Sequence, residues 1–375
     1  MRLKIIQITN YFPPHYGGIE KVSYDVGNIL LSEHSVINLC FNDKNSYKEE
    51  ISDNNLVIRC NIIGKISSQQ ISLNFGKVLK RIVNEFNPDV IHFHFPNPLQ
   101  AYHLLRILKK RQDIKLIVHY HLDITKQKIL KHLFVNQTKK LLDRAVKVIA
   151  TSPNYVEDSI FLDMIKDKVN IIPNTFNEKL LNPSENTLKM VDEIKEKYKN
   201  KHLVFFVGRH VEYKGLKYLI KASKFLSDKY QIIIAGSGPL TKELSKNTNP
   251  IIEFIGPIDD ELKHAYLLAC SCFAFPSITK NEAFGIALLE AMISQKTSVT
   301  FRVKGSGISY VCPNNVCGKE ARLYDCKEFA SNIEMLCNDQ DLNKMLGLNA
   351  YNRALRLFSI EVFNEAVLKL YGDEI

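Results

Sequence analysis

Short apolar runs alternate with longer stretches of helical periodicity along nearly the whole chain, and this alternation most restricts the possible folds. The apolar runs predict strands at residues 3–8, 36–40, 57–63, 90–93, 116–119, 146–150 and 169–172, then at 203–207, 231–235, 251–254, 272–275 and 298–301. The periodic stretches predict helices at 19–31, 75–85, 100–110, 126–143, 216–226, 260–269 and 285–294. Strands that alternate with helices form parallel sheets covered on both faces, so the predicted class is α/β.

A stretch rich in Pro, Asn and Ser separates the two series of strands. It includes Pro173, Asn174 and residues 182–186, and it is the best candidate for a linker. We therefore predict two doubly wound, parallel-sheet domains, 1–177 and 178–355, with an interdomain cleft, followed by a C-terminal segment, 356–375. Ligands bind such sheets outside the carboxyl ends of the strands, so candidate site residues are expected there.

The composition is that of an ordinary globular protein. Of the 375 residues, 45% are hydrophobic and 24% are charged, and the length allows two cores. No apolar run approaches the roughly 18 residues of a spanning helix. The N-terminus has no long apolar region typical of a signal peptide, which favours a cytoplasmic location. None of the eight cysteines fits a two-by-two zinc framework, which favours reduced, mostly buried thiols.

The net charge of +10 is concentrated in the first half of the chain. Residues 1–175 hold 24 Lys and Arg against 16 Asp and Glu, and residues 126–147 alone hold seven basic residues and one acid. Apolar residues are interleaved with these cations at helical spacing. Such a basic amphipathic helix is typical of a surface that binds an anionic membrane or nucleic acid, although a solvated helix face has the same pattern.

Two carboxylates, Glu282 and Glu290, stand on either side of a predicted turn between a buried strand and a helix. Gly285 begins the helix, and free N–H groups at a helix start bind anions. In a continuous helix, eight residues would separate the carboxylates by roughly 12 Å. A hydrolytic carboxylate pair needs about 5–9.5 Å, so the spacing favours contacts with hydroxyls at two ends of an extended ligand.

Two cations follow the first strand of the second series. Arg209 and Lys214 flank a short loop that ends in Gly215, and together they suit a diphosphate. Gly17 and Gly18, after the first strand of the chain, would also let the backbone approach an anion, although a plain turn explains them equally well.

Two histidine pairs end neighbouring predicted strands. His92 and His94 share one strand face, as do His119 and His121, so four imidazoles could converge. Imidazole is a common metal ligand, but no Asp or Glu except Asp123 stands close to either pair in the expected ligand role. A hydrogen bond from His121 to a bound substrate is the favoured interpretation. The acid-x-acid string at residues 339–341 is interpreted as a solvated turn in a polar region, and no metal site is predicted.

Taken in chain order, these motifs resemble those of the retaining family-4 glycosyltransferases of the GT-B fold. The match covers nearly the whole chain. The fold class that the resemblance implies is therefore α/β, GT-B, with two Rossmann-like domains. The segment from Arg353 to Tyr371 resembles the last helix of the family, which returns to the N-terminal domain. Residues 89–98 and 119–124 are similar to a branch common in bacterial surface-polysaccharide assembly. The motifs that carry the resemblance are Gly17-Gly18, Gly208-Arg209 to Lys214-Gly215, and Glu282-x7-Glu290.

The resemblance implies a metal-independent, retaining hexosyltransferase without a cofactor. Arg209 and Lys214 would neutralise the donor diphosphate, Glu282 would bind the sugar hydroxyls, and His121 would contact the transferred sugar. The remaining donor contacts would come from Gly17, Gly18, Phe284, Gly285, Ile286 and Glu290, the last of which would hold the ribose. The expected partners are a nucleotide sugar and a lipid-linked or oligosaccharide acceptor, but no nucleic acid. We also expect residues 126–147 to bind an anionic membrane at the inner face of the cell.

Two alternatives remain at this stage. One is a nucleotide-sugar epimerase of the same fold, which would turn over donor without acceptor. The other is a protein that binds nucleic acid or membrane through its basic face without catalysis. The family commonly has a small-Gly-Lys-Pro turn where this chain has residues 293–297, which leaves the conformation of that turn open. The glycine-rich loop at 303–307 has no assigned role.

Overall fold

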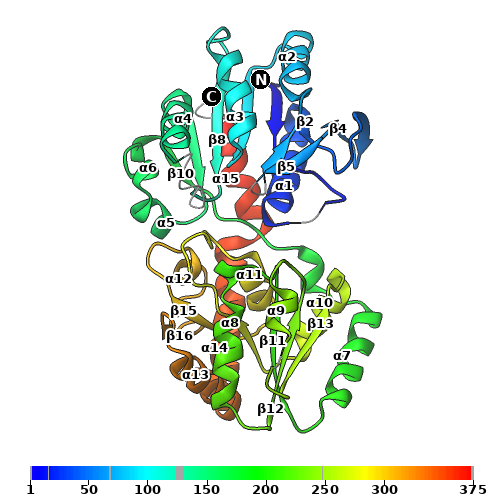
Figure 1. The fold of residues 1–375 in the computed structure, drawn as a ribbon, viewed down its shortest axis with the longest axis vertical. Helices are drawn as coiled ribbons and strands as arrows, with labels where there is room; N and C mark the ends of the chain where they lie inside the picture. Colours follow the sequence, from blue (N-terminus) through cyan, green and yellow to red (C-terminus); the bar gives the residue numbers. More distant parts are fainter. Residues whose placement is uncertain (1, 16, 67–68, 124–130, 247, 373–375) are drawn as a thin grey trace. The chain divides into compact units, whose positions relative to one another are not determined.

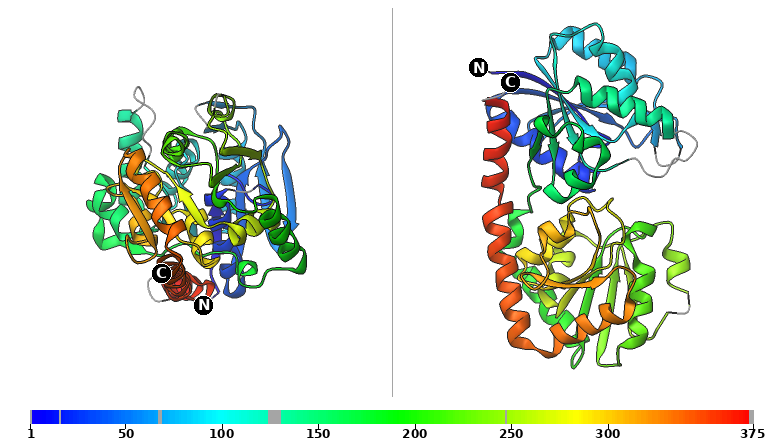
Figure 2. Two further views of the ribbon diagram at one scale, coloured as in Figure 1. Left: turned by 90° about the horizontal axis from the view of Figure 1, so that it is seen from below. Right: turned by 90° about the vertical axis from the view of Figure 1, so that its left-hand side faces the viewer.

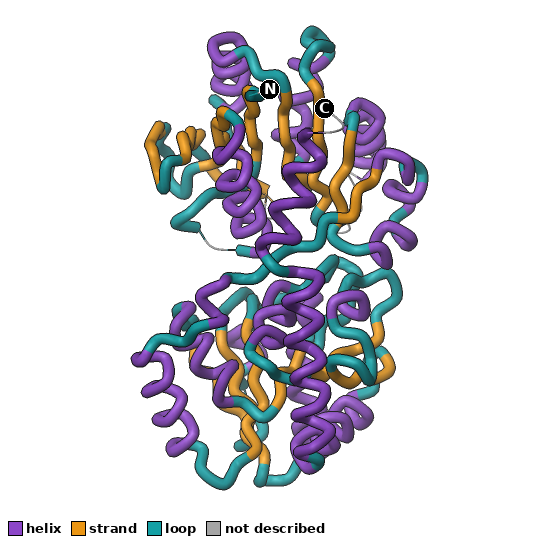
Figure 3. The backbone as a smooth tube through the Cα atoms, turned by 180° about the vertical axis from the view of Figure 1, so that it is seen from behind, coloured by secondary structure: helices purple, strands orange, loops and turns teal. Residues whose placement is uncertain are grey.

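The computed structural model describes residues 2–15, 17–66, 69–123, 131–246 and 248–372. The chain divides into two compact units (Figure 1). The N-terminal unit runs from the start of the chain to Ile172 and also includes the segment from Phe363 onward, whereas the C-terminal unit is Pro173–Val362. Each unit has its own β-sheet with helices on either side (Figure 3).

The sheet of the N-terminal unit has eight strands in the order β10-β9-β8-β7-β1-β2-β4-β3, parallel except for the pair β3–β4. Its strands are β1 (Lys4–Ile8), β2 (Ser35–Phe41), β3 (Lys48–Ser52), β4 (Asn55–Cys60), β7 (Val90–Phe95), β8 (Lys115–Tyr120), β9 (Lys147–Ala150) and β10 (Val169–Ile171). A separate hairpin pairs β5 (Gly64–Ile66) with β6 (Gln69–Ile71). Its helices are α1 (Gly18–Glu33), α2 (Phe75–Phe86), α3 (Pro98–Leu108), α4 (Lys131–Arg144), α5 (Pro153–Asp158), α6 (Ile160–Asp163) and α15 (Ile360–Gly372).

The sheet of the C-terminal unit is entirely parallel, in the order β13-β12-β11-β14-β15-β16. Its strands are β11 (His202–Val207), β12 (Tyr230–Ala235), β13 (Ile252–Gly256), β14 (Cys272–Phe275), β15 (Ser298–Arg302) and β16 (Gly318–Arg322). Its helices are α7 (Glu185–Lys197), α8 (Leu216–Ala222), α9 (Thr241–Leu244), α10 (Asp260–Ala269), α11 (Ile286–Ile293), α12 (Ile308–Val311), α13 (Cys326–Asn338) and α14 (Gln340–Phe358).

All twelve predicted strands are present, and the N-terminal sheet is parallel except at one edge. There β3 pairs antiparallel with β4, and Glu49 and Ile51 of β3 are exposed. The edge strand β3 and the edge strand β16 were not predicted. Both are short and carry several charged residues, so they lack the apolar run by which a buried strand is recognised.

In each sheet, the strand order reverses beside the first strand of the unit, and this reversal positions the candidate residues. In the C-terminal unit, β12 and β13 lie on one side of β11, and β14, β15 and β16 lie on the other. In the N-terminal unit, the reversal falls between β1 and β7. The loops after the two central strands diverge at such a point and leave room for a ligand. Arg209 and Lys214 follow β11, and Glu282 follows β14, so these residues come from the two diverging loops.

The last helix is part of the N-terminal unit. Figure 2 shows α15 running along the sheet of that unit, and the Tyr371 hydroxyl hydrogen-bonds His92 Nδ1 of β7 at 2.7 Å. Tyr371 is buried, with 3% of its surface exposed. The chain therefore begins and ends in the same unit.

Candidate functional site

The loop after β14 leads into α11 through a glycine in the left-handed region. Gly285 is the N-cap of α11 with φ +96°, and a Cβ there would stand 3.2 Å from the ring of Phe275. Among the described residues, the N–H groups of Gly285, Ile286 and Ala287 have no hydrogen-bond acceptor. Phe284 is buried against Phe358, so that residue offers its backbone and not its ring. The start of α11 is thus an open cluster of donors.

Glu282 and Lys214 form an ion pair between the two loops. Lys214 Nζ lies 2.5 Å from Glu282 Oε2, and the Ser277 hydroxyl donates to the same oxygen at 3.0 Å. Both charged side chains are largely buried, with 13% and 10% of their surfaces exposed. Burial alone would lower the pKa of Lys214, but the Glu282 carboxylate outweighs it and raises the pKa, so Lys214 stays charged. The sequence did not predict that these two side chains would touch.

Backbone contacts join the basic and acidic motifs into one site. The N–H of Ile278 donates to the carbonyl of Tyr213 at 2.9 Å. Gly215 has φ +66°, and a Cβ there would overlap the carbonyl oxygen of Pro276, so glycine is required on both counts. Arg209 is exposed at the end of β11, and among the described residues it forms no ion pair with a carboxylate. It therefore remains available to an anionic ligand.

The glycine-rich loop at 303–307, which has no role in the sequence analysis, supports Glu282. The Ser306 hydroxyl donates to the carbonyl of Glu282 at 2.7 Å, and the N–H of Gly307 donates to the same oxygen at 3.2 Å. A Cβ at Gly307 would overlap the carbonyl of Ala283. The loop therefore fixes the backbone from which the Glu282 side chain projects.

Glu290 lies on α11 and is held by a residue that the sequence analysis missed. Lys263 of α10 donates to Glu290 Oε1 at 2.7 Å, and its ammonium also lies 2.9 Å from Asp260 Oδ1. The two partners of the buried pair have exposed side-chain fractions of 17% for Lys263 and 12% for Glu290. Nothing in the spacing of these residues marks the pair, because the contact depends on how α10 packs beside α11.

The structure shows the conformation of the turn after α11, which the sequence left open. Gln295 has φ +56°, and its N–H donates to the carbonyl of Met292 at 3.0 Å. This is the left-handed helix ending that glycine adopts without strain. Here a glutamine occupies it.

The predicted glycines of the N-terminal unit lie at the start of α1. Gly17 is the N-cap and Gly18 the first helical residue, and both are exposed. A Cβ at Gly17 would overlap the carboxylate of Glu20, whose pKa is raised by burial. The side chain nearest this helix start is therefore itself an acid.

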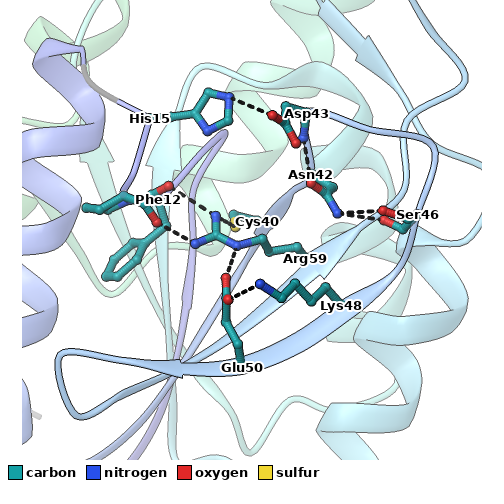
Figure 4. Close-up of polar contacts among 10 residues, drawn as sticks. Phe12, His15, Cys40, Asn42, Asp43, Ser46, Lys48, Glu50 and Arg59 are labelled. Atoms are coloured by element: carbon teal, nitrogen blue, oxygen red, sulfur yellow. Dashed lines mark hydrogen bonds and ion pairs between the residues drawn. The ribbon is translucent and has the colours of Figure 1, made fainter.

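The chain that leads to this glycine turn is anchored by a buried arginine (Figure 4). Arg59 of β4, 4% exposed, donates to the carbonyls of Phe12 and Pro13, the former at 3.0 Å. Glu50 balances its charge at 2.5 Å and also pairs with Lys48. Because all three nitrogens of the guanidinium donate to oxygens within the protein, Arg59 is a structural anchor.

His121 belongs to a stack of four buried histidines on β7 and at the end of β8. His94 Nδ1 lies 3.0 Å from His121 Nε2, and His92 Nε2 lies 3.4 Å from His119 Nδ1. Burial lowers the pKa of His92 and His121 to about 3 and holds the pKa of His94 and His119 well below its usual value. All four rings are therefore neutral at neutral pH.

The nitrogen–nitrogen distances in the stack meet one condition of a metal site. One nitrogen each from His92, His94 and His119 lies within 4.8 Å of the others. However, the His94 ring is nearly parallel to the other two, with interplanar angles of 25° to His92 and 23° to His119. Lone pairs lie in the plane of each imidazole, so the small tilt of the His94 ring disfavours a metal ion shared by all three rings. The histidines are held together by hydrogen bonds and stacking.

Part of the predicted basic surface can be located. Lys126 and Lys128 lie outside the described residues, whereas Lys139 and Lys140 of α4 are exposed. On the opposite side of the helix, Leu141 and Leu142 are buried. The described part of α4 is therefore amphipathic. Arg144, which is also part of the predicted basic surface, instead donates to the carbonyl of Ile114 at 2.7 Å and so holds α4 to the chain before β8.

Other sequence features have structural explanations. Asp339 of the acid-x-acid string accepts the N–H of Leu342 at 2.9 Å and caps α14. All eight cysteines are free, and seven of them are buried. Within the described residues, no helix is both long and apolar enough to cross a membrane.

Family models match both units. The model for group 1 glycosyl transferases matches residues 190–353, and the model for glycosyltransferase family 4 matches residues 16–179. Together they span most of the chain. The chain therefore belongs to the group 1, family 4 glycosyltransferases. The recognition made from the sequence motifs is confirmed.

Similar proteins agree with the assignment. The chain is 27% identical to O-antigen chain mannosyltransferase C of Escherichia coli over 96% of this chain and 95% of that protein. It is 28% identical to D-rhamnosyltransferase WbpZ of Pseudomonas aeruginosa over 81% and 78% of the two chains. Among solved structures, sucrose-phosphate synthase of Thermosynechococcus elongatus superposes with a TM-score of 0.82 at 20% identity, covering 99% and 98%. Anabaena HepE in complex with UDP and glucose superposes at 0.80 with 17% identity, covering 99% and 100%. The fold is GT-B, as predicted.

Proposed function

We propose that the chain is a retaining hexosyltransferase that moves a hexose from a nucleotide-diphosphate sugar to a lipid-linked or growing glycan in surface-polysaccharide assembly. The observation that carries the proposal is the site where the loops after β11 and β14 meet. There the charged Lys214 pairs with Glu282, Arg209 is exposed at the end of β11, and among the described residues the first N–H groups of α11 have no acceptor. The names of the O-antigen chain mannosyltransferase and the D-rhamnosyltransferase, together with the complex of HepE with UDP and glucose, support the same substrate classes.

In the proposed reaction, the bond between the anomeric carbon and the diphosphate breaks as the acceptor oxygen bonds to the same face of that carbon. The hydroxyl proton of the acceptor passes to an oxygen of the departing diphosphate. Arg209 and Lys214 stabilise the charge that develops on the diphosphate, which is the main catalytic contribution we assign to the protein. Fixed cations supply this stabilisation, so the proposed mechanism needs neither a metal nor a cofactor.

The other predicted residues take binding roles in this proposal. Glu282 accepts hydrogen bonds from hydroxyls of the donor sugar, Glu290 binds the ribose, and the N–H groups of Gly285 and Ile286, next to Phe284, bind the phosphate or sugar. The loop at Gly17 and Gly18 meets the phosphate, and His121 contacts the transferred sugar. Because His121 Nε2 already lies 3.0 Å from His94 Nδ1, the neutral ring would use Nδ1 for this contact.

The central test compares Lys214→Met with Lys217→Met. Lys217 is an exposed lysine three residues further on, at the start of α8, and is the matched control. With purified protein, a panel of UDP, GDP and ADP sugars and a lipid-linked acceptor, we expect Lys214→Met and Glu282→Gln to lower kcat by about 100-fold or more. Lys217→Met should stay near wild type. Near-native transfer by either Lys214→Met or Glu282→Gln would refute the assignment of these residues to the active site.

Product analysis separates the alternatives. Nuclear magnetic resonance of the product should show the same anomeric configuration as the donor, with activity unchanged by EDTA. Interconversion of the donor sugar without acceptor would instead indicate the epimerase. Salt-sensitive binding of nucleic acid that is unaffected by Lys214→Met would indicate the non-catalytic alternative.

We also propose that residues 126–147 bring the enzyme to the inner, anionic face of the cell membrane. The exposed Lys139 and Lys140 on the amphipathic α4 support this proposal. Each basic residue near an anionic surface contributes about 1 kcal/mol, so Lys139→Gln with Lys140→Gln should weaken binding roughly 30-fold. The assay is co-sedimentation with phosphatidylglycerol vesicles. Lys189→Gln with Lys195→Gln, on exposed positions of α7, is the control, and equal losses for both pairs would contradict the proposal.

A further inference from the structure

A hollow opens on the surface of the N-terminal unit between the C-terminal ends of α3 and α4. The two helices pack side by side, and Gln137 of α4 donates to the carbonyl of Pro98 in α3 at 2.8 Å. The hollow has a volume of about 480 Å³, within the range of roughly 300–1,000 Å³ that is typical of small-molecule sites. We call it the α3–α4 hollow, and the residues that line it are Leu105, Leu108, Lys109, Gln112 and Arg144.

Two cations line the α3–α4 hollow, and no acid is among its described lining residues. Arg144 Nη2 donates to two backbone carbonyls at 3.3 and 2.7 Å, so the guanidinium is fixed in place. Among the described residues, Nε and Nη1 of Arg144 have no acceptor, and the Lys109 ammonium has no ion pair. Asp113, close by in the chain, is instead paired with Arg111 at 2.6 Å. The lining therefore favours an anion.

The ends of the two helices explain the charges only in part. Lys109 is the C-cap of α3 and Arg144 is the last residue of α4, so each cation also stabilises the negative end of a helix dipole. That role would be filled equally well by cations that point into solvent. It does not require that both cations line one hollow together with leucine side chains.

The uncharged part of the lining restricts the kind of anion. Leu108 is buried and Leu105 is half-buried, so aliphatic surface lies beside the cations, and the Gln112 side chain adds an amide. No aromatic ring is among the described lining residues, so nothing there would stack on a nucleobase. A ligand that matches this lining carries a phosphate and, next to it, aliphatic carbon.

We propose that the α3–α4 hollow binds the headgroup of an anionic phospholipid. The phosphate lies between Lys109 and Arg144, and the glycerol and the first acyl carbons contact the two leucines. The inference rests on the proposed membrane association, because it takes an anionic bilayer as the partner. It adds a site for a single lipid headgroup, built partly from α3, to the diffuse attraction that the exposed lysines of α4 supply.

The experiment compares Lys109→Gln with Lys110→Gln in the full chain. The two lysines are neighbours and both are exposed, but Lys110 does not line the hollow. Co-sedimentation with vesicles of phosphatidylglycerol and phosphatidylcholine is measured at about 0.15 M and about 0.5 M KCl, because the higher salt screens diffuse attraction more strongly. A hydrogen bond to a charged group contributes about a factor of ten in affinity. At the higher salt, Lys109→Gln should therefore bind about tenfold more weakly than the wild type, whereas Lys110→Gln should bind equally well.

A second variant tests the apolar part of the hollow without a change of charge. Leu105→Gln should weaken binding to the same vesicles by about threefold or more, because it removes aliphatic contact with the lipid. Leu73→Gln changes a leucine that is 78% exposed and lies outside the hollow, so it should bind like the wild type. Circular dichroism confirms that each variant is folded.

Equal binding by Lys109→Gln and Lys110→Gln at both salt concentrations would overturn the inference and leave the proposed membrane association intact. Failure of the wild type to bind any vesicle would refute that association as well. Binding of inorganic phosphate, glycerol 3-phosphate or single-stranded RNA that depends on Lys109, with vesicle binding unaffected by Lys109→Gln, would also overturn the lipid assignment. Hexose transfer to a water-soluble acceptor should be unchanged in Lys109→Gln, so the catalytic part of the proposed function is tested separately.

Discussion

Mild acid is expected to destabilise the N-terminal unit, because its four stacked histidines are folded in the neutral state. Burial lowers the pKa of His92 and His121 to about 3, whereas a histidine in an unfolded chain titrates near 6.5. Between those values the unfolded chain binds more protons than the folded chain, so the free energy of unfolding falls as the pH falls. Above about pH 6.5 the histidines are neutral in both the folded and the unfolded chain, so they do not reduce the free energy of unfolding.

The size of the effect follows from the distance below the unfolded pKa. At pH 5, about 1.5 units below it, each of these two histidines removes about 2 kcal/mol, or about 4 kcal/mol together. His94 and His119, with pKa values also well below normal, add to this loss. A loss of this size is a large part of the stability of an ordinary domain.

Urea denaturation followed by circular dichroism at pH 7.5, 6.5 and 5 measures the change, and amide hydrogen exchange of β7 and β8 peptides locates it. The double variant His92→Gln with His121→Gln should be less stable at pH 7.5 but should lose less on acidification. His202→Gln changes a partly exposed histidine of the C-terminal unit and should keep the wild-type profile. A free energy of unfolding that changed by less than about 1 kcal/mol between pH 7.5 and 5 would refute the reasoning.

Three substitutions probe the loops that build the donor site. Gly285→Ala forces a Cβ into the left-handed region beside Phe275, so we expect a loss of about 1–2 kcal/mol in thermal denaturation and weaker nucleotide binding by titration. Ser306→Ala removes a hydrogen bond to the carbonyl of Glu282, so stability should fall by about 1 kcal/mol and the KM for donor should rise in steady-state assays. Gln295→Gly relieves a left-handed glutamine and should raise stability by up to about 1 kcal/mol with activity unchanged; destabilisation would contradict the assigned strain.

The buried strands could be predicted from the sequence because their apolar runs are dictated by burial on both sheet faces. The edge strands β3 and β16 could not, since an edge strand is defined by its neighbour and not by its own hydrophobicity. The residues at the strand ends, such as Lys214 and Glu282, were also predictable, because parallel strands bring successive loops to one edge. The direct ion pair between Lys214 and Glu282 could not be predicted, because it depends on side-chain directions in two irregular loops.

The contacts of Lys263 and Ser306 were beyond sequence reasoning for a related physical reason. Each residue reaches the site from an element far away in the chain, and no local spacing records how those elements pack. Lys263 lies 27 residues before Glu290, and Ser306 lies 24 residues after Glu282. Residues that act through tertiary contact alone leave no periodic signature.

The place of Tyr371 has a consequence for biosynthesis on the ribosome. His92 and the Tyr371 hydroxyl that contacts it are 279 residues apart in the chain, and the whole C-terminal unit lies between them. The ribosome must therefore synthesise the whole C-terminal unit before His92 can form this contact. A nascent chain stalled before residue 360 should therefore remain a client of chaperones even after its C-terminal unit has folded.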